Sequence, residues 1–267
     1  MQILIGTDVE IFLRGIHNKK LIPSWEVIAN NKDNPYIFEN SDLSNYTMFI
    51  DNVALEFNIP PARNKAEFKR SIYIAISYID DYLTDRCINV RMETDFMVTL
   101  SEEQRNNIKS MEFNCNPDYN AWNNKYNPPV TNIGKHRFSG GHVHIGARFD
   151  SPDEVIRLVK RLDYYLGLWS VSQCKDEEIE RRKMYGRAGD FRPKLYGLEY
   201  RVLSNFWIFD SNFIDEVYDR TMMAVKDKLN IDNQIDYFKD DIIDCINNVD
   251  KQKAYQLTNE IKKKCVV

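Results

Sequence analysis

The chain has 267 residues, of which 43% are hydrophobic, and its formal net charge is −4. This length and composition suit one large domain, or one domain with a small C-terminal appendage. The negative charge argues against a nucleic-acid partner, as does the lack of a basic arm, an RNP pattern or zinc-finger spacing.

The cysteines and the apolar stretches indicate the compartment. Five scattered cysteines without a CxxC pair favour a reducing cytosol over a disulfide framework. The N-terminal apolar stretch is interrupted by Asp8 and Glu10, and no other stretch approaches the roughly 18 apolar residues of a membrane span. We therefore expect a soluble, cytoplasmic protein without a membrane partner, and the sequence leaves its oligomeric state open.

Alternating apolar and polar residues dominate the first half of the chain, and helical periodicity separates and follows them. Strands are predicted at 2–12, 47–59, 90–98, 109–116, 142–149 and 197–207. Helices are predicted at 65–84, 152–173, 176–184, 211–228, 235–248 and 251–264. The elements do not alternate as βαβα, and no Gly-rich turn follows the first strand. This order favours an α+β fold with a mainly antiparallel sheet.

Two details complete the predicted secondary structure. Ser151, Pro152 and Glu154 match a helix start with a capping box. The stretches 117–136 and 185–196 are predicted to be irregular, and ordered loops as long as the first are usually functional. We expect 117–136 to act as a lid.

Four predicted strands carry ionisable residues on one face, because residues i and i+2 of a strand point the same way. In chain order these residues are Asp8 and Glu10, then Glu56 with Asn58, then His142, His144 and Arg148, and last Glu199 and Arg201. If these faces are coplanar, several carboxylates and two imidazoles converge. Divalent cations are the simplest remedy for the resulting repulsion, and oxygen-rich ligands favour Mg²⁺ or Mn²⁺.

Each motif also has an ordinary explanation, such as a solvated strand face or a Glu199–Arg201 ion pair. The recurrence of one pattern on four strands favours a metal site. Glu199 is closely preceded by Arg187, Arg192 and Lys194. In isolation these residues would suit a solvated basic loop, but beside a metal site they favour the binding of phosphate oxygens.

Five segments together resemble the phage-type carboxylate–amine ligases (amidoligases of type 2), which are related to the catalytic domains of glutamine synthetase and glutamate–cysteine ligase. They are GTDVEIF, DNVALEFNIPPA, CNPDYNAW, SGGHVHIG and YGRAGDFRPKLYGLEYR. The resemblance covers about residues 1–210. It implies a ligase catalytic domain there, with the C-terminal helices of 211–267 packed on the same domain. It also implies a curved sheet like the glutamine synthetase half-barrel, with helices on its convex face.

The resemblance further implies ATP, two or more Mg²⁺ ions and an acyl-phosphate intermediate that is attacked by an amine. By position, it makes metal ligands of Asp8, Glu10, Glu56, His142 and Glu199. His144 would face the nucleotide phosphates, and Arg192 and Arg201 would act catalytically on the transferred phosphoryl group. The substrates would be a small-molecule or peptide carboxylate and an amine, in the host cytoplasm if a phage encodes the chain. The first motif departs from glutamine synthetase, which has two glutamates there.

Two other functions stay open at this point. One is a metal-dependent hydrolase whose His142 and His144 activate water, which would prefer Zn²⁺. The other is a non-catalytic nucleotide- or metal-binding module on the same fold. No general base for a ligase can be assigned from the sequence, and Asp51, just before the second motif, is only a weak candidate.

Overall fold

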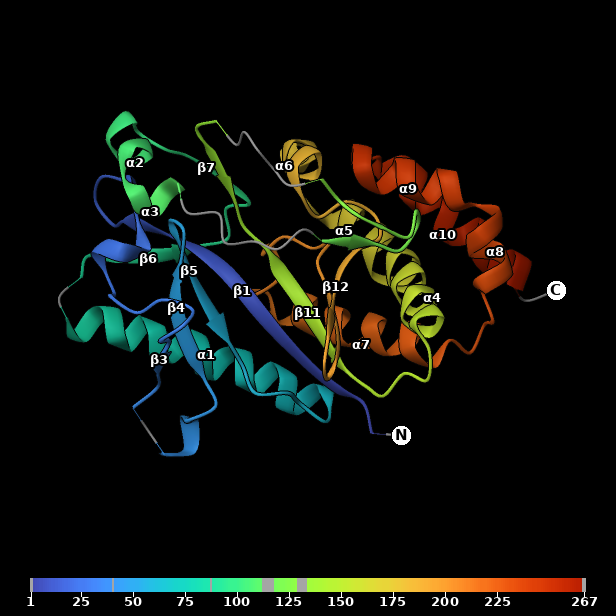
Figure 1. Ribbon diagram of the computed structural model, residues 1–267, viewed down its shortest axis with the longest axis horizontal. Helices are drawn as coiled ribbons and strands as arrows, with labels where there is room; N and C mark the ends of the chain where they lie inside the picture. Colours follow the sequence, from blue (N-terminus) through green and yellow to red (C-terminus); the bar gives the residue numbers. More distant parts are fainter. Residues whose placement is uncertain (1, 40, 87, 112–117, 129–133, 266–267) are drawn as a thin grey trace.

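The computed structural model describes residues 2–39, 41–86, 88–111, 118–128 and 134–265. In these residues the chain forms an eleven-stranded sheet, a two-stranded sheet and a set of helices (Figure 1). Every pair of strands in the described residues is antiparallel. The predicted α+β class with a mainly antiparallel sheet is therefore confirmed.

The large sheet has the strand order β3-β4-β5-β1-β11-β13-β12-β8-β9, and β2 and β6 pair with the far half of β1. This path does not close into a barrel. Its strands are β1 (Leu4–Gly15), β2 (Leu21–Ile22), β3 (Tyr36–Ile37), β4 (Thr47–Asp51), β5 (Ala54–Asn58), β6 (Val90–Glu93), β8 (Tyr119–Asn120), β9 (Lys125–Tyr126), β11 (Gly141–Gly146), β12 (Asp190–Lys194) and β13 (Gly197–Tyr200). The small sheet pairs β7 (Met97–Thr99) with β10 (His136–Phe138).

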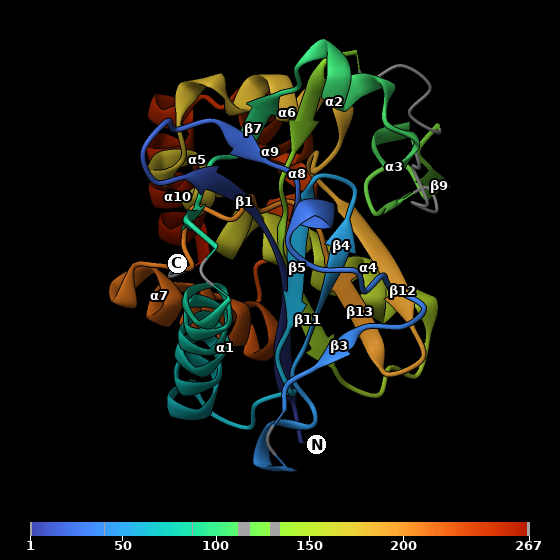
Figure 2. The same ribbon diagram turned by 90° about the vertical axis from the view of Figure 1, so that its left-hand side faces the viewer.

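Helices α1 and α7 lie together on one side of the sheet (Figure 2). The α-helices are α1 (Lys65–Asp85), α2 (Glu102–Asn106), α3 (Ile108–Met111), α4 (Pro152–Leu162), α5 (Leu168–Gln173), α6 (Ile179–Met184), α7 (Ser211–Lys226), α8 (Asp232–Tyr237), α9 (Lys239–Asn248) and α10 (Lys251–Cys265). The π-helical turn η3 (Asp163–Gly167) joins α4 to α5, and 3-10 turns are η1 (Ser24–Glu26), η2 (Ser41–Leu43) and η4 (Asp176–Glu178). None of the described helices combines the length and the apolar character needed to cross a bilayer.

Strand alternation separates the core from the polar face of the sheet. Ile5, Val9 and Ile11 of β1 are fully buried in one cluster with Phe68 and Ile72 of α1. The intervening residues of β1 point to the opposite side, as the period of two requires. Burial of the apolar side against the helices thus fixes which side carries the ionisable residues.

Several predicted boundaries were wrong. The stretch 47–59 is a hairpin, because Asn52 adopts a left-handed conformation (φ 53°) between β4 and β5. The strand predicted at 90–98 is interrupted between β6 and β7, and the stretch 185–196 contains β12. The start of 109–116 is helical in α3, whereas its remainder, 112–117, lies outside the described residues.

The helix predictions did better. The helix at 65–84 is α1, and the Asn64 side chain caps it by accepting a 2.9 Å hydrogen bond from the Glu67 N–H. Pro152 begins α4, but the predicted capping box is absent, because the Ser151 side chain makes no cap hydrogen bond and Glu154 instead accepts from the Asp150 N–H at 3.0 Å. The single helix predicted at 235–248 is split into α8 and α9.

Candidate functional site

The register of four neighbouring strands brings the predicted ionisable residues together on one face. Asp8 of β1 lies opposite His142 of β11, and Glu10 lies opposite Glu56 of β5. In the next pair of strands, His144 lies opposite Glu199 of β13. Residues far apart in sequence therefore form a continuous polar area across the sheet.

Two sets of three side chains within this area have the spacing of metal ligands. In each set, one potential ligand atom per residue lies within 4.8 Å of the others. We call Asp8, His144 and Glu199 the mixed group. We call Glu10, Asp51 and Glu56 the carboxylate group. Because β1 contributes one residue to each group, two positions apart, the groups adjoin each other.

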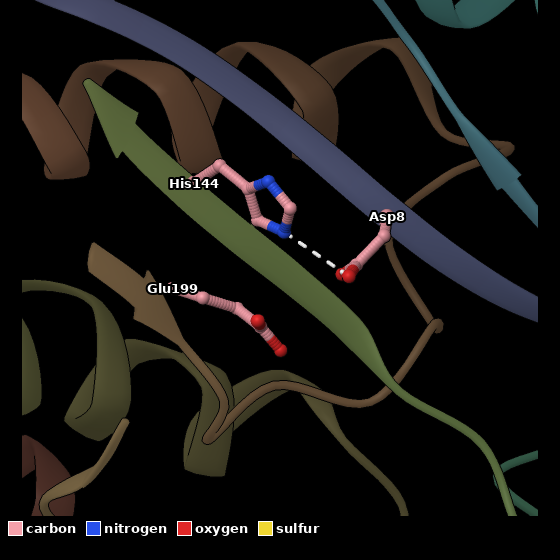
Figure 3. Close-up of side chains that lie close together, drawn as sticks. All are labelled: Asp8, His144 and Glu199. Atoms are coloured by element: carbon pink, nitrogen blue, oxygen red, sulfur yellow. Dashed lines mark ion pairs between the residues drawn. The ribbon is translucent and has the colours of Figure 1, made fainter. Parts of the chain in front are cut away.

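The side chains of the mixed group point toward one another from β1, β11 and β13 (Figure 3). His144 Nε2 lies 3.1 Å from Asp8 Oδ2, and the Tyr196 hydroxyl lies 2.9 Å from His144 Nδ1. Burial raises the pKa of Asp8, but the adjacent His144 and His142 overcome this and hold that pKa well below its usual value. The Asp8 carboxylate is therefore ionised at neutral pH.

Three cationic side chains surround Glu199. Lys194 Nζ lies 2.6 Å from Glu199 Oε2, Arg192 Nη1 lies 3.7 Å from Oε1, and Arg201 Nη1 is ion-paired with Oε1. Burial and Asp8 raise the pKa of Glu199, but Arg201, His142 and Arg192 lower it to about 2. Arg192, Lys194 and Arg201 thus adjoin the mixed group, and their N–H groups are of the kind that suits phosphate oxygens.

The carboxylate group has a different electrostatic character. Glu10 and Glu56 are 8% and 7% exposed and face each other across two strands. Burial, followed by the charge of Asp51, raises the pKa of Glu10 to about 7. Burial, followed by the charge of Asp8, raises the pKa of Glu56 well above its usual value. Buried carboxylates in this arrangement are stable when they are protonated or when they share a cation.

His142 of β11 contacts two residues of the mixed group. Its Nδ1 is 3.0 Å from Asp8 Oδ1 and 3.6 Å from Glu199 Oε1. Its Nε2 is buried without a hydrogen-bond partner among the described residues and faces Gly140, where a Cβ atom would come within 2.1 Å. Burial lowers the pKa of His142 to about 4, so the ring is neutral at pH 7. The mixed group, which is defined by the distances between ligand atoms, contains His144 and not His142. That His142 binds a metal therefore stays a prediction.

The metal implied by the resemblance fits these residues. The mixed group offers two carboxylates and an imidazole, and the carboxylate group offers oxygen ligands alone. Such donors suit Mg²⁺ and Mn²⁺, whereas zinc sites usually contain more nitrogen or sulfur. The raised pKa values in the carboxylate group indicate a lack of compensating positive charge, which a divalent cation would supply.

Sequence reasoning missed or misplaced some residues of this area. Asp51 joins the carboxylate group because the turn at Asn52 changes the alternation that a single strand would have imposed. Asp118 contacts Arg192 and Arg201, and only its position in the motif CNPDYNAW hinted at it. The Arg187 guanidinium donates a hydrogen bond to the carbonyl oxygen of Lys183 on α6, a contact outside the two groups.

A cavity of about 740 Å³ lies between the β12–β13 hairpin and the start of α4. Its walls include the aromatic side chains of Tyr119, Phe149 and Phe191. Lys194 and Tyr196 also line it, and these two residues contact Glu199 and His144. Phe191 belongs to the buried core and pairs with Tyr200, whereas Glu199 lies on the opposite face of the same strands, so most of the cavity lies on the helix side of the sheet.

The chain matches a known protein-family model. The sequence model for phage phiEco32-like COOH.NH2 ligase-type 2 matches residues 133–266, which is half of the chain and includes His142, His144 and Glu199. The match extends through the C-terminal helices, whereas the motifs of Asp8, Glu10 and Glu56 precede it. No curated protein matches the sequence. The chain belongs to the phage phiEco32-like COOH.NH2 ligase-type 2 family.

Proposed function

We propose that the chain is an ATP-dependent ligase that joins a carboxylate to an amine through an acyl phosphate. Family membership supports carboxylate–amine ligation. The observation that supports ATP and divalent cations is the adjacency of the two groups on β1, with Arg192, Lys194 and Arg201 beside one of them. ATP-dependent phosphoryl transfer relies on such positioning and charge neutralisation.

In the proposed reaction, a carboxylate oxygen of the acid substrate attacks the γ-phosphorus of ATP. The bond between that phosphorus and the β–γ bridging oxygen breaks, and ADP leaves. The amine nitrogen then attacks the acyl carbon, phosphate leaves with its electron pair, and the nitrogen loses a proton. The products are the amide, ADP and phosphate, so the reaction balances.

The polar face would divide the work among its residues. Asp8, Glu199 and one or both histidines, His142 and His144, would hold one Mg²⁺ or Mn²⁺, and the carboxylate group would hold another. Divalent cations held there would neutralise phosphate charge. Arg192 and Arg201 would contact the transferred phosphoryl group, and Lys194 would contact the nucleotide phosphates. We assign no direct contact to Arg187.

We also propose the larger framework for this reaction. The open antiparallel sheet, with α1 and α7 on one side, supports a half-barrel of the glutamine synthetase type. Helix α7 packs against α1 and α4, which supports a catalytic domain of residues 1–210 with residues 211–267 packed on it. The cysteines Cys174, Cys245 and Cys265 are free thiols, which supports activity in a reducing host cytoplasm.

Hydroxylamine trapping would test the acyl phosphate without knowledge of the natural amine. The protein would be incubated with ATP, Mg²⁺, hydroxylamine and a library of amino acids and small peptides. ADP release and hydroxamate formation should both require the same carboxylate, and ¹⁸O from that carboxylate should appear in phosphate. ADP release without ¹⁸O transfer for any active carboxylate would contradict the mechanism. Zinc-dependent hydrolysis without ATP would support the hydrolase instead.

A further inference from the structure

Asp118 occupies a position between the two arginines proposed to act in catalysis. It is 7% exposed and lies immediately before β8. Its Oδ1 atom is 2.9 Å from Arg192 Nε and 2.9 Å from Arg201 Nε. A single carboxylate oxygen therefore contacts the same nitrogen of both guanidinium groups.

Strand pairing determines this position. Tyr119 pairs with Phe191, so the antiparallel register brings the preceding residue, Asp118, beside Arg192. The Asn127 N–H closes the hairpin by donating a 2.7 Å hydrogen bond to the Asp118 carbonyl oxygen. Backbone hydrogen bonds thus hold Asp118 in place independently of the contacts of its side chain with the two arginines.

The β8–β9 hairpin is itself anchored by buried polar contacts. The side-chain amides of Asn120 and Asn127 donate to Asp190 Oδ1 at 3.0 and 2.7 Å. Trp122 Nε1 donates a 2.6 Å hydrogen bond to Asp163 Oδ2, in the π-helical turn η3. These contacts connect residues 118–127 to β12 and to the helices. They favour a fixed support over the lid predicted for 117–136, whose residues 129–133 lie outside the described part.

We propose, on the basis of the proposed function, that Asp118 is a positioning residue for phosphoryl transfer. By holding each guanidinium at Nε, it directs the Nη nitrogens toward Glu199. Arg201 Nη1 is ion-paired with Glu199 Oε1, and Arg192 Nη1 lies 3.7 Å from the same atom. A guanidinium has five N–H donors in a rigid fork, so contacts at Nε leave Nη donors for phosphate oxygens. Asp118 itself does not touch the substrate.

Kinetics of three substitutions test the proposal. Asp118→Ala should lower the kcat for ADP release about 100-fold, since small misplacements of positioning groups cost that much. Asp118→Asn, which retains the shape and one acceptor, should lower it about 10-fold, and Asp118→Glu should recover part of the loss. The KM for MgATP should change less than about three-fold in each, because geometry at the phosphoryl group affects the transition state most.

The matched control is Asp232, which also forms an ion pair with an arginine side chain. Arg161 donates to it from Nε and Nη2, both at 2.6 Å, on the helical side of the molecule. Asp232→Asn should therefore leave kcat unchanged. If Asp118→Asn behaves like Asp232→Asn in an active enzyme, the positioning role is wrong. If Asp118→Ala does not fold, the Asn variant still decides.

A second readout does not depend on activity. In protein labelled with ¹⁵N-arginine, the Nε–H signals of Arg192 and Arg201 would be assigned from Arg192→Lys and Arg201→Lys. Hydrogen exchange of both should be about ten-fold faster in Asp118→Asn than in wild type and unchanged in Asp232→Asn, because the ion pair that restrains both guanidinium groups is lost. Unchanged exchange in Asp118→Asn would overturn the proposal. Failure of wild-type protein to release ADP with any carboxylate would contradict the proposed function alone.

Discussion

The mixed group and the carboxylate group lie side by side on one sheet face but have opposite electrostatic balance. In the mixed group, neighbouring histidines and arginines lower the pKa values of Asp8 and Glu199 despite burial. In the carboxylate group, burial and repulsion from nearby carboxylates, Asp8 among them, raise the pKa values of Glu10, Asp51 and Glu56. In the mixed group, cationic side chains of the protein therefore compensate the negative charge of the carboxylates. The carboxylate group lacks such compensation.

This difference indicates how the fold tolerates so many buried acids. Arg192, Lys194 and Arg201 contact Glu199 directly. The charge of Lys32 lowers the pKa values of Asp51 and Glu56. Because Lys32 is exposed, solvent screens much of this effect. We infer that cation binding contributes more to the stability of the carboxylate group than to that of the mixed group.

The largest expected effect is the loss of activity in Glu199→Gln. This substitution removes the charge that holds three cationic side chains and one proposed metal ion. We expect ADP release in the presence of an amine to fall at least about 100-fold, a loss of roughly 2.7–4 kcal/mol, with the fold intact. The measurement is a coupled ADP assay with circular dichroism as a folding check. The control is Glu180→Gln, which removes an exposed ion pair with Lys183. Survival of activity in Glu199→Gln would exclude the proposed ligand set.

Cation-free stability should change in opposite directions in the two groups. Glu56→Gln relieves repulsion and should raise the free energy of unfolding in EDTA, whereas Asp8→Asn breaks contacts with both histidines and should lower it. Each change should be about 1–3 kcal/mol, as for other buried polar contacts. Urea unfolding measures this, and Mn²⁺ titration should show weaker binding in both variants. If the free energy of unfolding changed in the same direction in both variants, the proposed electrostatic difference between the two groups would be wrong.

The pH dependence of cation-free stability should follow Glu10. The raised pKa of Glu10, about 7, means that its protonated form is favoured in the folded state. Its contribution is complete below the ordinary glutamate pKa near 4.5 and is lost as pH rises through 7. We therefore expect the free energy of unfolding in EDTA to fall by about 1–3 kcal/mol between pH 5.5 and 8.

The controls for this pH dependence are Glu10→Gln and added Mn²⁺, and both should flatten the slope. Asp8 raises the pKa of His144 despite the burial of that ring. The contribution of His144 to the free energy of unfolding therefore also decreases as pH rises. The variant His144→Gln separates its share from that of Glu10. An equal slope in wild type and Glu10→Gln would assign the effect to other groups.

The sequence predicted the shared polar face because strand alternation is a local property. It identified Asp8, Glu10, Glu56, His144 and Glu199 on that face, and the register then brought them together. It did not predict the groupings, because these depend on which strands are neighbours.

Residues positioned by turns were the most difficult to predict. The hairpin at Asn52 changed the position of Asp51, and β12 was taken for a loop. Asp118 could not be connected with Arg192 and Arg201 because the β8–β12 pairing joins segments about 70 residues apart. Periodicity indicates the face of a strand but not its partner.

The smallest expected effects come from two tyrosines, each of which contacts one group. The Tyr185 hydroxyl donates a 3.2 Å hydrogen bond to Glu10 Oε2, and burial raises the pKa of Tyr185 well above its usual value, so it remains a donor. The Tyr196 hydroxyl contacts His144 of the mixed group. Tyr185→Phe and Tyr196→Phe each keep the ring and remove one hydrogen bond.

Each substitution should weaken only one of two Mn²⁺ binding steps, by about five-fold, equivalent to about 1 kcal/mol. Electron paramagnetic resonance titration would resolve the steps, and the double variant should show both losses, since the hydroxyls contact different groups. If both variants weaken the same step, the polar face binds its cations as one coupled site, and the division into two groups is wrong.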